Sequence, residues 1–221
     1  MNRSLLALLI LIMSFPLLAE WLSASKKTIL FSEKKLADVK KRYGSSASER
    51  LTDWKQFITA NLKKSESDKL QLTNDFLNGQ LRWVADDELW QQKDYWATPL
   101  ETLIKSAGDC EDFTIIKYFT LISLGVPVER LKLTYVKALE YNQAHMVLTY
   151  SKNKRSVPLV LDNINKKILP APKRTDLKPV YSFNGEGMWI QKQQNLGKRV
   201  GNSSRIRLWT KLTNRMKKEQ L

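Results

Sequence analysis

The chain reads Gly108-Asp109-Cys110-Glu111-Asp112-Phe113 at the point where a helix is expected to begin. Gly108 interrupts the helical pattern before it, and Asp109 is a residue type that caps helix N-termini. Cys110 is therefore predicted at the first position of a helix that ends at Gly125. A thiol at that position lies beside unpaired backbone N–H groups and the positive end of the helix dipole, and both favour the thiolate.

Three helices are predicted upstream of this segment, and we interpret them as scaffold. Ser32 can cap a helix that ends at Gly44, and apolar residues then recur at three-to-four spacing over Leu51–Leu62. A third helix is predicted from about Asp68 to Gly79, since a glycine often ends a helix.

The segment Gln80–Ala97 has no helical period. It carries four large aromatic residues among acids, which predicts an ordered loop with little aromatic surface left in water: Trp83, Trp90, Tyr95 and Trp96. A short helix is predicted to begin at Pro99, because Thr98 and Glu101 have the spacing of a capping box and proline suits the first helical position.

Beyond Pro127 the hydrophobic period changes from helical to two. Strand-like runs cover Leu131–Tyr135, Ala144–Tyr150, Val157–Asp162 and Val180–Phe183, and Asn184–Gly187 has the composition of a turn between strands. Helices thus precede strands along the chain. This order predicts an α+β fold with a mainly antiparallel sheet.

The N-terminus has the pattern of a secretory signal peptide. Arg3 precedes an apolar run of about 14 residues, which is shorter than the roughly 20 that a membrane-spanning helix needs. We therefore expect residues 1–24 to be removed on export to the periplasm. An uncleaved anchor or a buried first helix is the alternative. We expect one domain over residues 25–191 and a separate tail over residues 192–221.

The charge of the chain is concentrated in that tail. The 221 residues carry 37 Lys and Arg against 22 Asp and Glu, a formal net charge of +15, and residues 192–221 hold nine of these cations and one Glu. Such a tail is expected to be disordered, or to form a basic helix after a flexible stretch at Gly197–Ser204, with weak membrane-surface contact as one use. Nucleic-acid binding is not expected, because the charge lies in one tail of an exported chain.

The chain has one Cys and one His, which restricts its chemistry. An internal disulfide and a structural zinc site are both excluded. If the two residues act together, Cys110 is the nucleophile, His145 on the second strand is the base, and Asp162 at the end of the next strand orients the imidazole. The alternative is that Cys110 is a small apolar core residue and His145 a hydrogen-bonded sheet residue.

These residues resemble a known family. The matching segments are Asp94–Glu101, Gly108–Phe113, Ala144–Leu148, Leu161–Asn163 and Pro179–Asn184, in unbroken order between Leu72 and Trp189. They are similar to the bacterial transglutaminase-like cysteine proteinases, and among these to the LapG-type periplasmic proteases. The resemblance implies a papain-like or transglutaminase-like fold with a Cys110, His145, Asp162 triad. It also implies cleavage of the N-terminal region of a large repeat-containing adhesin, which controls biofilm attachment.

The same resemblance implies a calcium site beside the nucleophile and an inhibitory partner. The positions that carry over for Ca²⁺ are Asp109, Glu111 and Asp112, and three carboxylates so close together repel one another unless a hard cation lies among them. Without calcium, Asp109 would only cap the helix while Glu111 and Asp112 complement its dipole. The implied partner is the periplasmic domain of an inner-membrane cyclic-di-GMP receptor.

An oxyanion hole and the reaction type remain open at this level. The Cys110 backbone N–H is one candidate donor, and the Trp96 indole or the Tyr95 hydroxyl is the second, unless these rings only pack the core. The same triad can also perform acyl transfer as a transglutaminase or amidase. A non-catalytic exported binding module with a basic tail is the third possibility.

Overall fold

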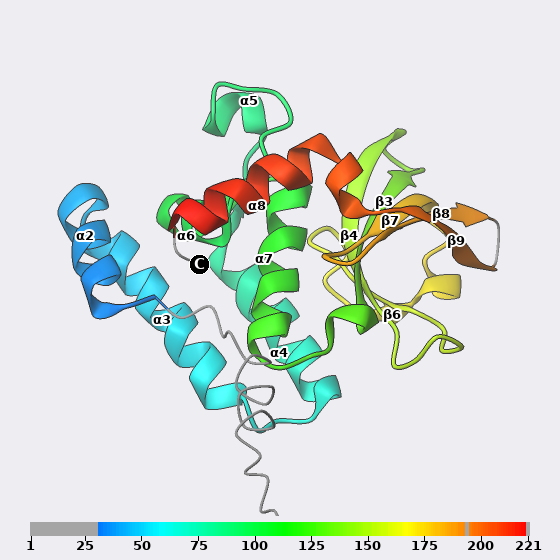
Figure 1. Cartoon of the computed structure of the whole chain (residues 1–221), viewed down its shortest axis with the longest axis horizontal. Helices are drawn as coiled ribbons and strands as arrows, with labels where there is room; N and C mark the ends of the chain where they lie inside the picture. The colour runs from blue at the N-terminus through cyan, green and yellow to red at the C-terminus, as the bar shows by residue number, and fades with distance from the viewer. Residues whose placement is uncertain (1–30, 193–194, 220–221) are drawn as a thin grey trace, which may run out of the picture.

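The structure, a computed structural model, describes residues 31–192 and 195–219. The predicted signal peptide, residues 1–24, lies outside the described residues. None of the helices in the described ranges is long and apolar enough to cross a membrane. The chain forms a helical half and a sheet half that meet along one helix, α7, which spans Cys110–Ser123 (Figure 1).

The N-terminal helices begin at their capping residues. In α2 (Glu33–Tyr43) the Ser32 hydroxyl accepts a hydrogen bond from the Lys35 N–H, and Gly44 follows with φ +88°, a left-handed value that favours glycine. Helix α3 spans Ser45–Asn61, and α4 spans Glu66–Gln80. The third helix starts slightly earlier than predicted because the Ser65 hydroxyl caps it.

A seven-stranded antiparallel sheet forms the second half, in the order β6-β5-β4-β3-β7-β8-β9. This confirms the predicted α+β class with an antiparallel sheet. The predicted turn is also present, since the Asn184 N–H donates to the Gly187 carbonyl at 3.0 Å. The strands and the short 3-10 turns between them are η1 Val128–Arg130, β3 Leu131–Ala138, β4 Gln143–Tyr150, β5 Leu159–Leu161, β6 Leu169–Pro170, η2 Ala171–Lys173, β7 Leu177–Phe183, β8 Met188–Lys192 and β9 Asn195–Gly201.

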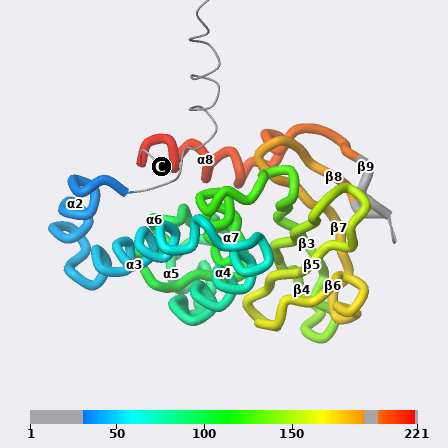
Figure 2. Tube along the Cα trace, turned by 90° about the horizontal axis from the view of Figure 1, so that it is seen from below, coloured from blue at the N-terminus to red at the C-terminus, as the bar shows by residue number. Residues whose placement is uncertain are grey.

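Helix α7 occupies the centre of the molecule (Figure 2), and most of its side chains are buried. On the helical side, the Trp54 indole N–H donates to the Thr120 hydroxyl at 2.8 Å. On the sheet side, the Thr114 hydroxyl donates to the Met146 carbonyl at 3.0 Å. Buried hydroxyl and indole groups need such partners. These two bonds fix the orientation of α7 against α3 and against β4.

The aromatic segment before α7 is ordered but less uniformly buried than predicted. It contains β1 (Arg82–Trp83) and the short helix α5 (Asp86–Leu89), and α6 (Pro99–Lys105) begins with the predicted capping box. β1 pairs in parallel with β2 (Ala107–Gly108). Trp96 is 4 % exposed, as expected, but Trp83 is 60 % exposed, so the prediction is wrong for that ring. Both residues of β1 lie at the surface and are exposed.

The basic C-terminal segment is part of the domain, which corrects the predicted boundary at residue 191. β9 pairs with β8, so the predicted flexible stretch Gly197–Ser204 contains a strand end and the 3-10 turn η3 (Ser203–Arg205). Helix α8 (Arg207–Glu219) then crosses over α7 (Figure 1). Trp209 packs its ring against three others in the core, Tyr118, Phe119 and Phe183, at centroid distances of 5.4–5.8 Å.

Most of the apolar side of α8 is used by this packing. Trp209, Leu212 and Met216 are between 0 % and 6 % exposed. A helix that inserts into a membrane surface needs an apolar face that is free to enter it. The face that would support the predicted membrane contact is therefore covered by the protein itself.

Candidate active site

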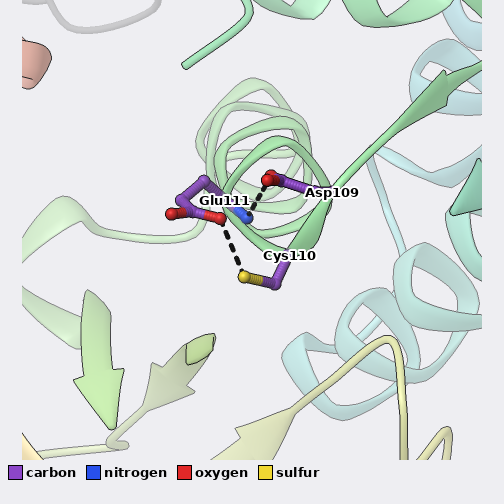
Figure 3. A group of neighbouring side chains, drawn as sticks. All are labelled: Asp109, Cys110 and Glu111. Atoms are coloured by element: carbon purple, nitrogen blue, oxygen red, sulfur yellow. Dashed lines mark hydrogen bonds between the residues drawn. The ribbon is translucent and has the colours of Figure 1, made fainter. Parts of the chain in front are cut away.

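The nucleophile candidate Cys110 lies at the first residue of α7, as predicted. The Asp109 carboxylate caps the helix by accepting a hydrogen bond from the Glu111 N–H at 3.2 Å (Figure 3). Between α6 and β2, Ser106 adopts a left-handed φ of +51°, which turns the chain from the helix into the strand. The sequence thus brings the thiol to the junction of a strand and a helix N-terminus.

The charges around Cys110 oppose the helix dipole. Its thiol donates a hydrogen bond to the Glu111 carboxylate at 2.8 Å (Figure 3). Burial first, and then the negative charges of Glu111 and Asp109, raise the pKa of the Cys110 thiol well above its ordinary value. Burial and these two carboxylates hold the cysteine as a neutral thiol.

Strand β4, which carries His145, runs beside the cysteine. The backbone N–H of Met146, the residue after His145, donates a hydrogen bond to the Cys110 sulfur. His145 is 2 % exposed, and its Nε2 lies 2.8 Å from Oδ1 of Asp162, at the end of β5. Since Nε2 is bonded to Asp162, proton exchange between His145 and any other group would have to use Nδ1.

Asp162 is held in place from several sides. Its Oδ2 accepts a hydrogen bond from Arg174 at 2.7 Å, and its Oδ1 also accepts one from the Ile164 N–H at 3.0 Å. Burial alone would raise the pKa of the Asp162 carboxyl, but the hydrogen bonds and positive charges of His145 and Arg174 bring it below its ordinary value. Asp162 is therefore an anion that fixes the imidazole.

Three further residues support Asp162 and were not found by sequence analysis. The Asn78 amide and the Lys117 ammonium each donate to the Asp162 carbonyl at 2.9 Å. Arg174 is 3 % exposed and is itself held by the Asp176 carboxylate at 2.7 Å. Lys117 is 1 % exposed, and burial lowers its pKa to about 7. Their spacing from Asp162 follows no local motif, so no signal in the sequence identifies them.

A cleft of about 560 Å³ opens beside the His145–Asp162 pair and is lined by these two residues and Arg174, among others. Its position gives the imidazole and its supporting groups a route to solvent. Pockets of this size accommodate small ligands or a few side chains of a polypeptide.

A cluster of largely buried carboxylates lies next to the cysteine. Ligand atoms of Asp86, Asp109 and Asp112 all lie within 4.8 Å of one another, and a second such group joins Asp109, Cys110 and Glu111. Asp86 was not predicted, because it lies in α5, far from the cysteine in the sequence. The predicted positions Asp109, Glu111 and Asp112 are brought together as expected.

The carboxylate cluster fits a hard cation. Oδ1 of Asp86 and Oδ2 of Asp112 are buried without a hydrogen-bond partner among the described residues, while their other oxygens accept the N–H groups of Tyr95 and Ala97. Burial and mutual repulsion raise the pKa of Asp86 to about 6 and of Asp109 to about 10. Buried, unpaired oxygen ligands of this kind are what Ca²⁺ prefers.

The two aromatic candidates for the oxyanion hole differ in availability. The Tyr95 hydroxyl donates its proton to the Glu101 carboxylate at 2.7 Å, so it is already used inside the protein. Trp96 is buried and stacks on Phe183 at a centroid distance of 5.7 Å. The Cys110 backbone N–H and the Trp96 indole stay predictions for this role.

A comparison with protein-family models assigns the chain to a family. Residues 44–195 match the model of the bacterial transglutaminase-like cysteine proteinase, BTLCP. The chain belongs to this family. It is a cysteine peptidase, and the expected transglutaminase-like fold is confirmed. The family match ends inside the sheet, before β9 is complete and before α8 begins.

Solved structures of one family member are similar to this chain over most of its length. Legionella pneumophila LapG treated with EGTA has 42 % sequence identity and a TM-score of 0.74, covering 85 % of this chain and 98 % of that one. Calcium-bound LapG from the same organism has 41 % identity and a TM-score of 0.72, covering 84 % and 99 %. No curated protein sequence matches the chain.

Proposed function

We propose that the chain is a calcium-dependent, periplasmic cysteine endopeptidase that releases a large surface adhesin by cutting its N-terminal region. The observation that carries this proposal is the arrangement of the only cysteine and the only histidine of the chain. Cys110 lies at the start of α7, and the backbone next to His145 donates to its sulfur while Asp162 holds the imidazole at 2.8 Å.

In the first half-reaction His145 accepts the thiol proton at Nδ1 while the Cys110 sulfur attacks the peptide carbonyl. Formation of the C–S bond gives a tetrahedral intermediate with an oxyanion, and the Cys110 backbone N–H and the Trp96 indole would act as its donors. Collapse of the intermediate breaks the C–N bond, and His145 gives the proton to the leaving amine. Asp162 stays ionised throughout, because His145 and Arg174 hold its pKa low.

In the second half-reaction His145 removes a proton from water, and the hydroxide attacks the thioester carbonyl. The C–S bond then breaks, the acid product leaves, and the imidazolium returns its proton to the sulfur. Water is the acceptor for a protease, whereas a primary amine would be the acceptor for a transglutaminase.

Asp86, Asp109, Asp112 and Glu111 would hold a Ca²⁺ ion. When bound, the ion supplies positive charge that offsets the carboxylates beside the nucleophile. The calcium-bound and EGTA-treated forms of the similar Legionella pneumophila LapG support a calcium site in this family.

The adhesin substrate, the periplasmic location and the inhibitory partner rest on the family resemblance and on the N-terminal sequence. A signal peptide over residues 1–24 would export the chain to the compartment where a membrane-retained adhesin is exposed. The periplasmic domain of an inner-membrane cyclic-di-GMP receptor would sequester the protease there. Biofilm attachment would then depend on whether the receptor holds or releases it.

The proposed function is tested with the purified mature protein and the N-terminal segment of a large repeat-containing adhesin from the same genome. We expect two fragments with Ca²⁺ and none after complete removal of calcium with EGTA. The repeat region of the same adhesin, without its N-terminal segment, is the control and is expected to remain intact. Cleavage that survives EGTA unchanged would contradict the calcium requirement, and an intact N-terminal segment would contradict the substrate.

The reaction type is tested with the same substrate and an excess of a primary amine. A protease gives two fragments, the first of which ends in a new carboxylate. A transglutaminase leaves the chain uncut and joins the amine to a glutamine side chain with release of ammonia, and an amidase converts a side-chain amide to a carboxylate with release of ammonia. Mass spectrometry of the products distinguishes these outcomes. We expect the two fragments.

A further inference from the structure

A second cleft, of about 590 Å³, lies between the loop Gln92–Trp96 and the start of α8. Tyr181 of β7 lines the cleft between these two segments. Arg215 of α8 joins them, because its guanidinium lies 4.5 Å over the Tyr95 ring and donates to the Trp96 carbonyl. The cleft therefore exists only because the C-terminal helix packs onto the domain.

The lining of this cleft is strongly basic. Four cations line it, Lys93, Arg207, Lys211 and Arg215, against one acid, Asp94. Arg215 is partly neutralised by Glu101 at 3.4 Å. Within residues 31–192 and 195–219, no carboxylate forms an ion pair with the other three cations. These side chains are exposed and available to an anionic ligand.

The cleft and the proposed nucleophile share the main hydrophobic core, because Tyr181 and Cys110 both pack against it. Tyr181 stacks on Tyr135 with ring centroids 5.2 Å apart. Burial first, and then neighbouring groups that include Glu111, raise the pKa of Tyr181 to about 12. Glu111 in turn accepts the hydrogen bond of the Cys110 thiol. Tyr135, Tyr181 and Cys110 all pack against the same hydrophobic core.

We propose that this cleft binds an acidic segment of the polypeptide substrate, next to the bond that is cut. This inference deepens the proposed function and rests on it. The cleft is concave and has aromatic side chains in its lining, which suits an extended peptide, whose acidic side chains would meet Lys93, Arg207 and Lys211. A flat anionic membrane is a poorer ligand, because the apolar side of α8 is buried.

The proposal is tested by binding, in the Cys110→Ala protein with Ca²⁺, so that no cleavage occurs. The probes are three fluorescein-labelled eight-residue peptides that alternate alanine with glutamate, glutamine or lysine, and affinity is measured by fluorescence anisotropy. We expect the glutamate peptide to bind more tightly than the glutamine peptide. The combined change Arg207→Glu and Lys211→Glu is expected to weaken it about tenfold, since two attractive contacts become repulsive, and to favour the lysine peptide.

The matched control is the combined change Lys217→Glu and Lys218→Glu. It lies on the same helix, alters the net charge by the same amount and leaves the cleft lining unchanged. We expect it to retain binding of the glutamate peptide within about twofold, because screened charges outside the cleft contribute little. Circular dichroism and thermal melting confirm that both variants are folded.

Three results would overturn the proposal. The first is equal affinity for the glutamate and glutamine peptides. The second is an equal loss of affinity for the glutamate peptide in the cleft variant and in its control. The third is binding to phosphatidylglycerol vesicles that needs Arg207 and Lys211, without any preference among the peptides. If no adhesin segment is cleaved while the glutamate peptide still binds the cleft, the proposed function fails and the cleft assignment stands. If cleavage proceeds without acidic preference, only the cleft assignment fails.

When the adhesin segment is cleaved, a kinetic measurement completes the test. Replacing the acidic residues that flank the cut site with their amides is expected to raise KM about tenfold with little change in kcat, as for the loss of uniform binding energy. The cleft variant should show the same KM for the acidic and the amide substrate.

Discussion

Replacing Arg174 with Met is expected to destabilise the protein and to release the carboxylate that orients His145. The Arg174 guanidinium lies 2.7 Å from Asp162, and the two side chains are 2 % and 0 % exposed. Removing one partner of a buried ion pair typically costs about 3–5 kcal/mol. Asp162 keeps its bonds to His145 and the Ile164 N–H, and the adjacent cleft admits water, so we expect the lower end, about 3 kcal/mol.

Urea denaturation and thermal melting measure this change. For a domain of this size about 3 kcal/mol corresponds to a loss of about 6–12 °C in Tm. Arg155→Met is the control, because Arg155 is exposed and forms no ion pair within the described ranges, and it should change stability by less than about 0.5 kcal/mol. A loss below about 1 kcal/mol in Arg174→Met would refute the account of this ion pair.

The same variant has a defined effect on pH dependence. The pKa of Asp162 is lowered in the folded protein, so its carboxylate stabilises the fold above the ordinary pKa of 3.8, and this contribution is lost as the pH falls through the folded pKa. Removing Arg174 raises the folded pKa of Asp162. The acid side of the stability curve should therefore move to higher pH in Arg174→Met, and an unmoved curve would contradict this reasoning.

Three further changes test other parts of the site. Asp86→Asn should weaken Ca²⁺ binding about tenfold or more in calorimetry while the fold is retained, because one charged ligand becomes neutral; unchanged affinity would exclude Asp86 from the site. Gly108→Ala should lower both stability and calcium affinity, since a Cβ there would lie 2.5 Å from the buried Asp112 side chain; overpacking of this kind costs about 1–3 kcal/mol. In the folded protein the pKa of Lys117 is about 7, whereas its ordinary value is 10.5, so between these pH values the unfolded chain binds more protons and stability rises with pH. Lys117→Met should flatten this rise. If urea titrations give the variant and the wild type the same slope of stability against pH, Lys117 does not titrate in this window.

Much of the fold could be predicted because its signals are local. Helix starts at Ser32, Pro99 and Cys110 are set by side chains that bond to nearby backbone N–H groups, and such bonds need no knowledge of the rest of the chain. The strands follow from alternation of apolar residues. In the C-terminal segment the predicted basic helix is present as α8, but β9 was missed. β9 carries charges and glycines that are poor strand signals, and it becomes a strand only by pairing with β8.

Part of the site could also be predicted, because some of its residues are close together in the sequence. Asp109, Glu111 and Asp112 are consecutive or nearly so, and the single Cys and His leave no choice for a Cys–His pair. Asp86 looks like one of several solvated acids in Asp86-Asp87-Glu88, and only the pairing of β1 with β2 brings it to the cluster. Arg174 and Lys117 reach Asp162 through tertiary packing, which leaves no pattern in the sequence.

The central claim is that Cys110 is the nucleophile of a peptidase and His145 its base. The most direct measurement is the rate of adhesin cleavage, with Ca²⁺, by the wild type, Cys110→Ala and His145→Ala, each checked for folding by thermal melting. We predict that both variants lose cleavage by at least about a thousandfold, because covalent and general-base catalysis act as one unit. Cleavage by Cys110→Ala at a rate near that of the wild type would contradict the claim, since the chain has no second cysteine to replace it.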